Sequence, residues 1–329
     1  MSAGERAEGT AGEVSGVDMT THLGTLELPN PVLTASGCSA AGRELDPFLD
    51  VAGLGAVVTK SIARAARPGR ATPRMAETPS GMLNSIGLQG PGIEAFLAKD
   101  VPWLRERGAR AVVSIAGGDA AEFAELAGRL AELGPEGGIS ALEVNISCPN
   151  VANRGLVFAC DPAASTQVIA GVVEVVAGRL PVLAKLSPDV TDIVEIARAC
   201  LDAGADGLAM INTTLGMVID TDTLRPVLAG ITGGLSGPAI RPIAVRCIYQ
   251  VHAAMRAGAL RPAPIVGIGG VRTGLDALQL VAAGACAVQV GTATFNDPSA
   301  PERVLGELRH ALAERGFARF VDAIGRAHD

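Results

Sequence analysis

The stretch Ala141-Leu142-Glu143-Val144, followed by Asn145-Ile146-Ser147-Cys148-Pro149-Asn150, organises this chain. Its first four residues read as a buried strand. Pro149 cannot donate a backbone hydrogen bond and disfavours helical geometry at Cys148, so the strand should open into a loop there. A thiol is thereby presented at a strand end between two carboxamides. Such a thiol can accept a proton, and asparagine amides suit a polar planar ligand; the alternative is that Cys148 is a small buried hydrophobe.

Composition places the chain among globular proteins. Of its 329 residues, 48% are hydrophobic and 19% charged, which favours a sizeable core over disorder. A formal net charge of -7, without a run of Lys or Arg, argues against nucleic acid as a partner. No apolar stretch reaches the ~18 residues of a membrane span and the start resembles no signal peptide, so we expect a cytoplasmic protein. The six cysteines form no C-x-x-C or Cys/His cluster, and no metal site is predicted.

The chain is expected to comprise a short tail and one large domain. Residues 1–17 are Gly, Ala, Ser and Glu with almost no bulky apolar residue, which predicts a mobile tail. Residues 18–329 have the length of a single (β/α)8 barrel. A hairpin over residues 20–28, around Gly24-Thr25, should precede the main sheet.

Eight candidate strands then alternate with helices. Most are near-continuous apolar runs, as expected for parallel strands covered on both faces. They span residues 32–36, 56–60, 111–115, 142–146, 182–186, 207–211, 264–268 and 287–290. Eight strands close a barrel, so the predicted fold is α/β, a (β/α)8 TIM barrel. The helix that precedes residues 203–207 should begin at Thr191 or Asp192 and bury a stripe that includes Ile196 and Cys200.

Excursions over the C-terminal face are expected after the second, fourth and sixth strands. Residues 61–110 and 212–263 exceed what one helix requires, and the loop that opens at Cys148 follows the fourth strand. A barrel builds its active site on this face.

Glycines, lysines and amides gather at the predicted strand ends. Gly267-Ile268-Gly269-Gly270 and Gly291-Thr292 follow the last two strands, where barrels often bind phosphate; the alternative is that these glycines only turn the chain. Lys60 ends the second strand and Lys185 lies near the end of the fifth, and an ammonium buried in the mouth needs an anionic or strongly polar partner. Snorkelling to the rim is the alternative for a lysine.

Amide side chains concentrate at the same mouth. Asn84-Ser85-Ile86-Gly87-Leu88 lies in the first long excursion, and Asn212-Thr213 follows the sixth strand. With Asn145 and Asn150 these groups suit a heterocycle that has several C=O and N–H edges.

At these positions the chain resembles the soluble class 1 dihydroorotate dehydrogenases, from about Thr20 to its last helix. The shared motifs are N-I-S-C-P-N at 145–150, N-S-I-G-L at 84–88, Lys60-Ser61, and T-G-G-L-S-G-P-A-I at 232–240. The last motif resembles the class 1B branch, whose members work with a separate electron-transfer subunit.

The resemblance implies an FMN enzyme that oxidises (S)-dihydroorotate to orotate in de novo pyrimidine (UMP) biosynthesis. Cys148 would be the general base that removes the C5 proton, while hydride passes from C6 to flavin N5. The resemblance also implies a homodimer. Reduction of NAD would require a partner chain with flavin and an iron–sulfur cluster; fumarate or another acceptor stays open.

The ligand contacts that the resemblance implies fall into two sets. The substrate would contact Lys60, Asn84, Ser85, Ile86, Gly87, Leu88, Asn145, Asn150, Asn212 and Thr213. FMN would contact Ser36, Lys60, Ser61, Asn145, Lys185, Ile211, Gly237, Gly269, Gly270, Gly291 and Thr292. Lys60 would also be catalytic, and Lys185 would stabilise negative charge on the reduced flavin ring.

Two departures from the family pattern leave alternatives open. Ser114-Ile115-Ala116-Gly117 stands where the family usually has N-x-x-G, and Gly87-Leu88-Gln89-Gly90 replaces G-L-Q-N. The first change should shorten or remove one amide contact. The alternatives are a dihydropyrimidine dehydrogenase-like FMN enzyme that acts on uracil or thymine, and a flavin-binding subunit without turnover.

Overall fold

The computed structural model describes residues 16–147 and 158–329. Cys148 and Asn150 lie outside the described residues, as do residues 1–15 of the predicted tail. Within the described part, Val17 already packs against the core, and the next residue is held by a hydrogen bond from Asp18 N to Ala318 O at 2.9 Å.

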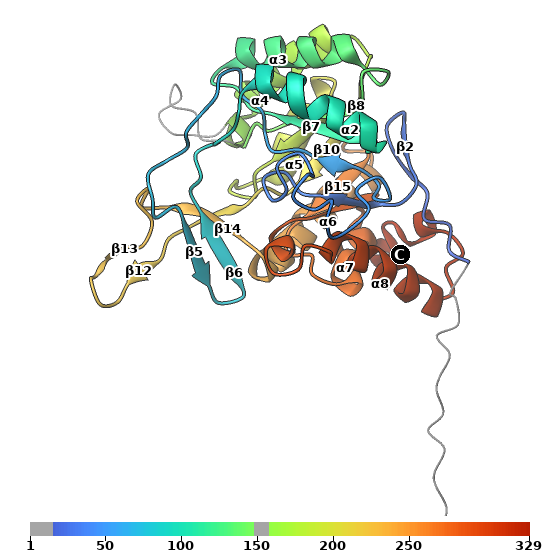
Figure 1. Ribbon diagram of the computed structural model, residues 1–329. Helices are drawn as coiled ribbons and strands as arrows, with labels where there is room; N and C mark the ends of the chain where they lie inside the picture. Colours follow the sequence, from blue (N-terminus) through green and yellow to red (C-terminus); the bar gives the residue numbers. More distant parts are fainter. Residues whose placement is uncertain (1–15, 148–157) are drawn as a thin grey trace, which may run out of the picture.

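Eight parallel strands form the central barrel (Figure 1). They are β3 (Val32–Thr34), β4 (Val57–Val58), β7 (Ala111–Ile115), β8 (Ile139–Val144), β9 (Val182–Leu186), β10 (Gly207–Met210), β15 (Ile265–Ile268) and β16 (Ala287–Val290). Their order is β3-β16-β15-β10-β9-β8-β7-β4, and a parallel bridge between Leu33 and Ala56 joins the two end strands. The predicted (β/α)8 barrel is therefore confirmed.

Successive residues of each strand point alternately into the barrel and toward the helices. In β8, Leu142 and Val144 belong to the apolar layer beneath the helices, whereas Ala141 belongs to the interior cluster. Glu143 and Asn145 share the side of Ala141 and are both buried. Strand β8 thus carries polar groups up the interior of the barrel to its mouth.

A hairpin closes the opposite end of the barrel. Strands β1 (Thr21–Leu23) and β2 (Leu26–Leu28) pair antiparallel. Leu23 and Leu28 are fully buried in the interior cluster, together with Leu183 of β9 and Val266 of β15. The lower barrel is therefore a packed apolar plug.

The described helices include long ones that cover the outside of the barrel and short ones near its mouth. They are α1 (Ile93–Ala95), the π-helical η1 (Phe96–Asp100), α2 (Val101–Arg107), α3 (Ala120–Leu133), η2 (Phe158–Cys160), α4 (Pro162–Val176), α5 (Ile193–Asp202), η3 (Pro238–Ile240), α6 (Arg241–Arg256), α7 (Gly274–Ala283), η4 (Thr292–Phe295), α8 (Ala300–Glu314), η5 (Phe320–Ala323) and η6 (Arg326–His328). Asp192 caps α5 by accepting from Val194 N and Glu195 N, and Ile196 and Cys200 are buried, as predicted. None of the described helices is long and apolar enough to cross a membrane.

The expected alternation of strand and helix does not hold in the first crossover. The described segment between β3 and β4 is a series of turns. Gly42 has a φ of +96°, and Pro47 disfavours helical geometry at the residue before it. These residues interrupt a helix that would otherwise form here.

The two long excursions pair with each other beside the barrel mouth. The first contributes β5 (Met75–Thr78) and β6 (Gly81–Asn84), and the second contributes β11 (Thr214–Gly216) and β14 (Gly233–Ser236). They form one four-stranded sheet in the order β11-β14-β6-β5, and a smaller hairpin of β12 (Ile219–Asp220) and β13 (Arg225–Pro226) extends from it. This arm projects sideways from the barrel (Figure 1).

Candidate active site

A chain of side-chain hydrogen bonds runs along one side of the barrel mouth and links the neighbouring strands β3, β4, β7 and β8. Ser61 Oγ lies 3.4 Å from Ser36 Oγ and 2.9 Å from Ser114 Oγ. Asn145 Nδ2 donates to the same Ser61 oxygen at 2.9 Å. Ser61, Ser114 and Asn145 are buried, so this hydrogen-bonded group holds neighbouring strand ends in fixed relative positions.

Asn212 extends this network across the mouth. Asn212 Nδ2 donates to Asn145 Oδ1 at 3.2 Å, and Asn212 Oδ1 accepts from Thr213 N at 2.8 Å. The predicted substrate residues at the ends of β8 and β10 are therefore in direct contact.

The segment 84–88 reaches the same mouth through the arm. Asn84 Nδ2 donates to Gly234 O at 3.3 Å, and a Cβ on Gly234 would overlap Thr213 Oγ1. Gly234 thus lies between the two predicted substrate residues. Ser85 Oγ accepts from Arg70 Nη1 at 3.0 Å and Ile86 O accepts from Arg70 N at 2.9 Å, which fixes the middle of the segment.

Two residues of this segment have backbone conformations that favour glycine. Gly87 has a φ of +76° and Leu88 a φ of +55°. The chain therefore turns sharply after Ile86.

Lys185 sits in the interior beneath the mouth and is paired with a carboxylate. Its Nζ lies 3.2 Å from Glu143 Oε1, and Gln289 Nε2 donates to Glu143 Oε2 at 2.8 Å. Glu143 is 0% exposed and Lys185 is 5% exposed. Ser147 Oγ donates to Lys185 O at 2.7 Å, which ties the end of the described β8 loop to β9.

Lys60 follows β4, two strands away from the β8 strand end that carries Asn145. Its backbone N–H donates to Ala40 O at 2.7 Å, so the chain leaves the barrel ladder here, and β4 is shorter than predicted. Burial raises the pKa of the Cys38 thiol to about 11, against the opposing influence of the positive charges of Lys60 and Lys185. Both lysines therefore act on one small region, and Cys38 is a thiol at neutral pH.

Glycines after β15 meet the start of α6. Gly269 and Gly270 have φ values of +134° and +70°. A Cβ on Gly270 would lie 2.8 Å from Gly237 O and 2.8 Å from Arg241 Cβ. Ile240 provides no side-chain cap for α6, and Arg241 N at the start of this helix would lie 3.1 Å from the same Cβ. A helix N-terminus with close glycine backbone is a favourable place for a phosphate group.

The remaining predicted cofactor residues border this cradle. Ile211 Cγ1 would lie 3.6 Å from a Cβ on Gly269. Thr292 Oγ1 donates to Ser236 Oγ at 2.9 Å, and a Cβ on Gly291 would lie 3.0 Å from Ala35 Cβ. The cradle, the lysines and the amides therefore surround one mouth.

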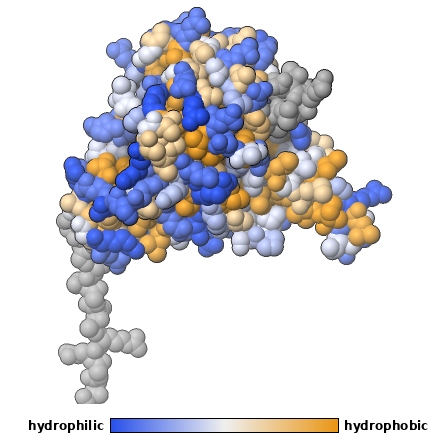
Figure 2. All heavy atoms as spheres, turned by 180° about the vertical axis from the view of Figure 1, so that it is seen from behind, coloured by the Kyte–Doolittle hydropathy of each residue, from blue (hydrophilic) through white to orange (hydrophobic). Residues whose placement is uncertain are grey.

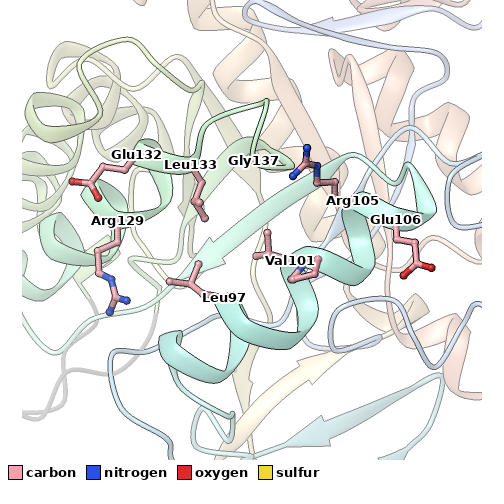
Figure 3. A pocket seen from close by; sticks show the side chains of 9 residues that line it. Leu97, Val101, Arg105, Glu106, Arg129, Glu132, Leu133 and Gly137 are labelled. Atoms are coloured by element: carbon pink, nitrogen blue, oxygen red, sulfur yellow. The ribbon is translucent and has the colours of Figure 1, made fainter.

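Two cavities differ in their relation to this mouth. A cavity of about 350 Å³ is lined by Lys60 and Thr59 at the mouth, with Gly90 from the first excursion. A larger cavity of about 770 Å³ lies between α2 and α3, lined by Leu97 and Leu133 among others (Figure 3). None of the predicted site residues lines the larger cavity, which belongs to the outer wall of the barrel.

Sequence reasoning missed two residues of this region, Glu143 and Gln289. Glu143 lies within an apolar run and Gln289 within the last strand, so neither stands out in the sequence. Each is nevertheless a single polar residue whose side chain points into the barrel. The signal was strand alternation: Glu143 stands two positions before Asn145, on the same side of β8.

The two departures from the family pattern have different surroundings. The hydroxyl of Ser114 is hydrogen-bonded to the hydroxyl of Ser61, so it already has a partner within the protein. Gly90 pairs with Arg67 as an antiparallel bridge, and the nearest atom to an added Cβ would be Leu88 O at 4.0 Å. A larger side chain would fit at position 90.

Comparisons with known proteins show to which family the chain belongs. The family model for dihydroorotate dehydrogenase matches residues 18–312. The chain is 51% identical over 94% of its length to the dihydroorotate dehydrogenase B (NAD(+)) catalytic subunit of Pelobacter propionicus, covering 98% of that protein. Identity is 48% to the proteins of the same name from Geobacter sulfurreducens and Trichlorobacter lovleyi, over 94% and 93% of this chain and 97% of each relative. The protein belongs to the dihydroorotate dehydrogenase family.

Proposed function

We propose that this protein oxidises (S)-dihydroorotate to orotate in de novo UMP synthesis, with FMN as its cofactor and Cys148 as the general base. The observation that carries the proposal is the direct contact between Asn145 and Asn212, at a mouth where the positive charges of Lys60 and Lys185 both reach Cys38. Amide donors and acceptors with a nearby positive charge match a pyrimidine that bears ring C=O and N–H groups and a carboxylate.

The residues present fit FMN. The cradle at Gly237, Gly269 and Gly270 offers close backbone and the N-terminus of α6 to a phosphate. Gly291 and Thr292 border it. When bound, FMN supplies the hydride acceptor.

Residues of the mouth would hold the flavin ring. Ser36, Ser61 and Asn145, which are linked by hydrogen bonds through Ser61, would offer polar groups to the ring, and the buried Ile211 would offer an apolar contact. Lys185, which is paired with Glu143, would supply a positive charge near the ring.

The substrate would be held by groups from three sides of the mouth. Residues 84–88 provide backbone and side-chain polar groups from the arm. Asn145, Asn212 and Thr213 provide them from the barrel, with Asn150 from the loop after β8. Lys60 would neutralise the substrate carboxylate, a charge that uracil lacks.

The proton transfer depends on the loop that begins at Asn145. Ser147 is anchored to Lys185 O, directly before Cys148 in the chain. This anchor fixes the last described residue before the proposed base, and general-base catalysis depends on such positioning.

The electron acceptor is proposed to be a separate subunit with flavin and an iron–sulfur cluster. The relatives are named catalytic subunits of NAD(+) enzymes, which supports a second kind of chain in the assembly. Copurification from the native source, followed by iron and flavin analysis, tests this proposal. A native catalytic chain that reduces NAD unaided would contradict it.

A homodimer is proposed to form through the arm. Leu215, Met217 and Leu224 are 67%, 52% and 78% exposed, and hydrophobic spheres gather on the projecting hairpin (Figure 2). Clustered exposed apolar residues mark association surfaces. Leu224→Glu should shift the mass measured by light scattering from dimer to monomer, whereas Leu275→Glu, at an exposed position on α7, should leave the mass unchanged.

The experiment that tests the function is anaerobic addition of (S)-dihydroorotate to the flavin-loaded protein. We expect the flavin absorbance to bleach, and orotate to slow the bleaching. Uracil in place of orotate should have little effect. A flavin that stays oxidised under these conditions would contradict the proposed activity, and bleaching by dihydrouracil would redirect it to a pyrimidine without a carboxylate.

A further inference from the structure

The interior of the barrel holds a buried charge pair together with a polar residue from the far wall. Strands β16 and β8 lie on opposite sides of the barrel, because three strands separate them in either direction around it. The hydrogen bond from Gln289 Nε2 to Glu143 Oε2, 2.8 Å long, therefore spans the interior. Gln289 is only 1% exposed, and its Oε1 has no hydrogen-bond partner within the described residues.

The orientation of the Gln289 amide follows from Glu143. Turning the amide over would place Oε1 against the carboxylate, which is repulsive, so the nitrogen must face Glu143. In this orientation Gln289 Oε1 is a buried acceptor that lacks a hydrogen bond within the described residues, which costs free energy. The carboxylate is thus held from both sides, by Lys185 and by Gln289.

Stability alone is a poor explanation for this cluster. Removing two charges from water is costly, and replacing a buried ion pair by apolar residues of similar size is often neutral or stabilising. The layer directly below, with Leu183 and Val266, shows that apolar side chains fill the barrel without such a pair.

Of these three residues, Lys185 is the one that contacts the loop in which the proposed base lies. Its backbone carbonyl holds Ser147, and its side chain lies under the mouth formed by Asn145 and Asn212. An ammonium there favours negative charge on a ring bound above it. A carboxylate 3.2 Å from that ammonium opposes the effect and also fixes where the ammonium lies.

We infer that Glu143 is a positioning residue that, with Gln289, holds the Lys185 ammonium in place and offsets its charge, and thereby lowers the reduction potential of the bound flavin. The inference rests on the proposed function, since it takes the flavin to be bound at this mouth. A flavin with a lower reduction potential passes its electrons more readily to the next acceptor. The driving force for substrate oxidation is then smaller.

The test is the flavin midpoint potential, measured by photoreduction of the FMN-loaded protein with a reference dye. This measurement needs no dihydroorotate. Glu143→Gln keeps the shape of the side chain but removes its charge, so we expect the equilibrium to shift at least tenfold toward reduced flavin. For a two-electron couple this is a rise of about 30 mV.

Gln289→Leu is the second variant and keeps both charges. It removes the donor that shields the carboxylate, so we expect a shift in the opposite direction, toward oxidised flavin, of about twofold to fivefold. If Glu143→Gln does not fold, this variant carries the test. Ser165→Ala is the matched control, because Ser165 is also 0% exposed and loses one hydrogen bond, to Phe158 O, but lies on α4 outside the barrel interior.

The outcomes separate the two proposals. Opposite shifts in the two interior variants, with an unchanged potential in Ser165→Ala, support the inference. Unchanged potentials in FMN-loaded Glu143→Gln and Gln289→Leu, even with lowered melting temperatures, show a purely structural role and overturn it. Wild-type protein that binds no FMN overturns the proposed function and this inference together, whereas FMN-loaded protein that dihydroorotate cannot bleach overturns only the proposed activity.

Discussion

Replacing Gly270 by alanine tests the phosphate cradle, because another glycine with a positive φ, just beyond the far end of α6, provides a closely matched control. Gly270 has a φ of +70°, and Gly258, which follows the other end of the same helix, has a φ of +73°. An alanine in this conformation costs about 1–2 kcal/mol at either position. The two positions differ in their surroundings: an added Cβ at Gly258 meets no atom within 4 Å, whereas one at Gly270 lies 2.8 Å from Gly237 O and from Arg241 Cβ.

The clash at Gly270 cannot relax without moving the cradle. Gly237 O and the start of α6 are backbone or close to it, so one of them must shift by several tenths of an ångström. We expect Gly270→Ala to weaken FMN binding by tenfold to a hundredfold, which is about 1.4–2.8 kcal/mol. Gly258→Ala should bind FMN as the wild type does, while both variants lose stability.

The assay is titration of apoprotein with FMN, followed by quenching of flavin fluorescence, with urea unfolding of the apoproteins measured in parallel. Unfolding reports the conformational strain common to both variants, and the titration reports the cradle alone. Equal FMN affinity in the two variants would falsify the assignment of this glycine cluster as the phosphate site.

Three further results are expected. Cys148→Ala should slow flavin reduction by dihydroorotate by ~10²- to 10⁴-fold with orotate affinity retained, as measured by stopped flow; a full reduction rate would exclude Cys148 as the base. Asn212→Ala removes the donor to Asn145 Oδ1 and should weaken orotate binding about tenfold in a flavin-difference titration, whereas an unchanged affinity would remove Asn212 from the site. The pKa of His252 is lowered by burial and then by the nearby charges of His328 and Arg256, so the folded state resists protonation there. The unfolding free energy should therefore be highest above about pH 6.5 and fall as the pH drops below that value. His252→Gln should flatten this slope in urea titrations, and an equally steep slope in that variant would assign it to other groups.

The sequence predicts the barrel well because strand periodicity is a local property. Residues 111–115 and 182–186 were delimited correctly by their continuous apolar runs. Strand β4 was overextended, because Lys60 N turns to Ala40 O, a contact set by a loop that has no periodic signal. Ends of strands depend on such partners, and the pattern of one segment does not reveal them.

The candidate site was predictable in its residue types and much less so in its pairings. Asn145 and Asn212 stand out as polar residues at the ends of apolar strands, and the structure brings them into contact. Glu143 and Gln289 do not stand out, because their partnership crosses the barrel and depends on strand order and register. The pairing of β6 with β14 is equally hard to predict, because it also joins segments that are far apart in the sequence.

This pairing between the excursions has a consequence for the order of assembly during synthesis. Asn84 finds its partner, Gly234, 150 positions later in the chain. A ribosome releases six of the eight barrel strands before β14 appears, so β6 has no partner on that side until then. Contacts between residues so distant in sequence form late and slowly. The arm over the mouth is therefore completed only after most of the barrel exists, and the cofactor should enter a nearly finished protein.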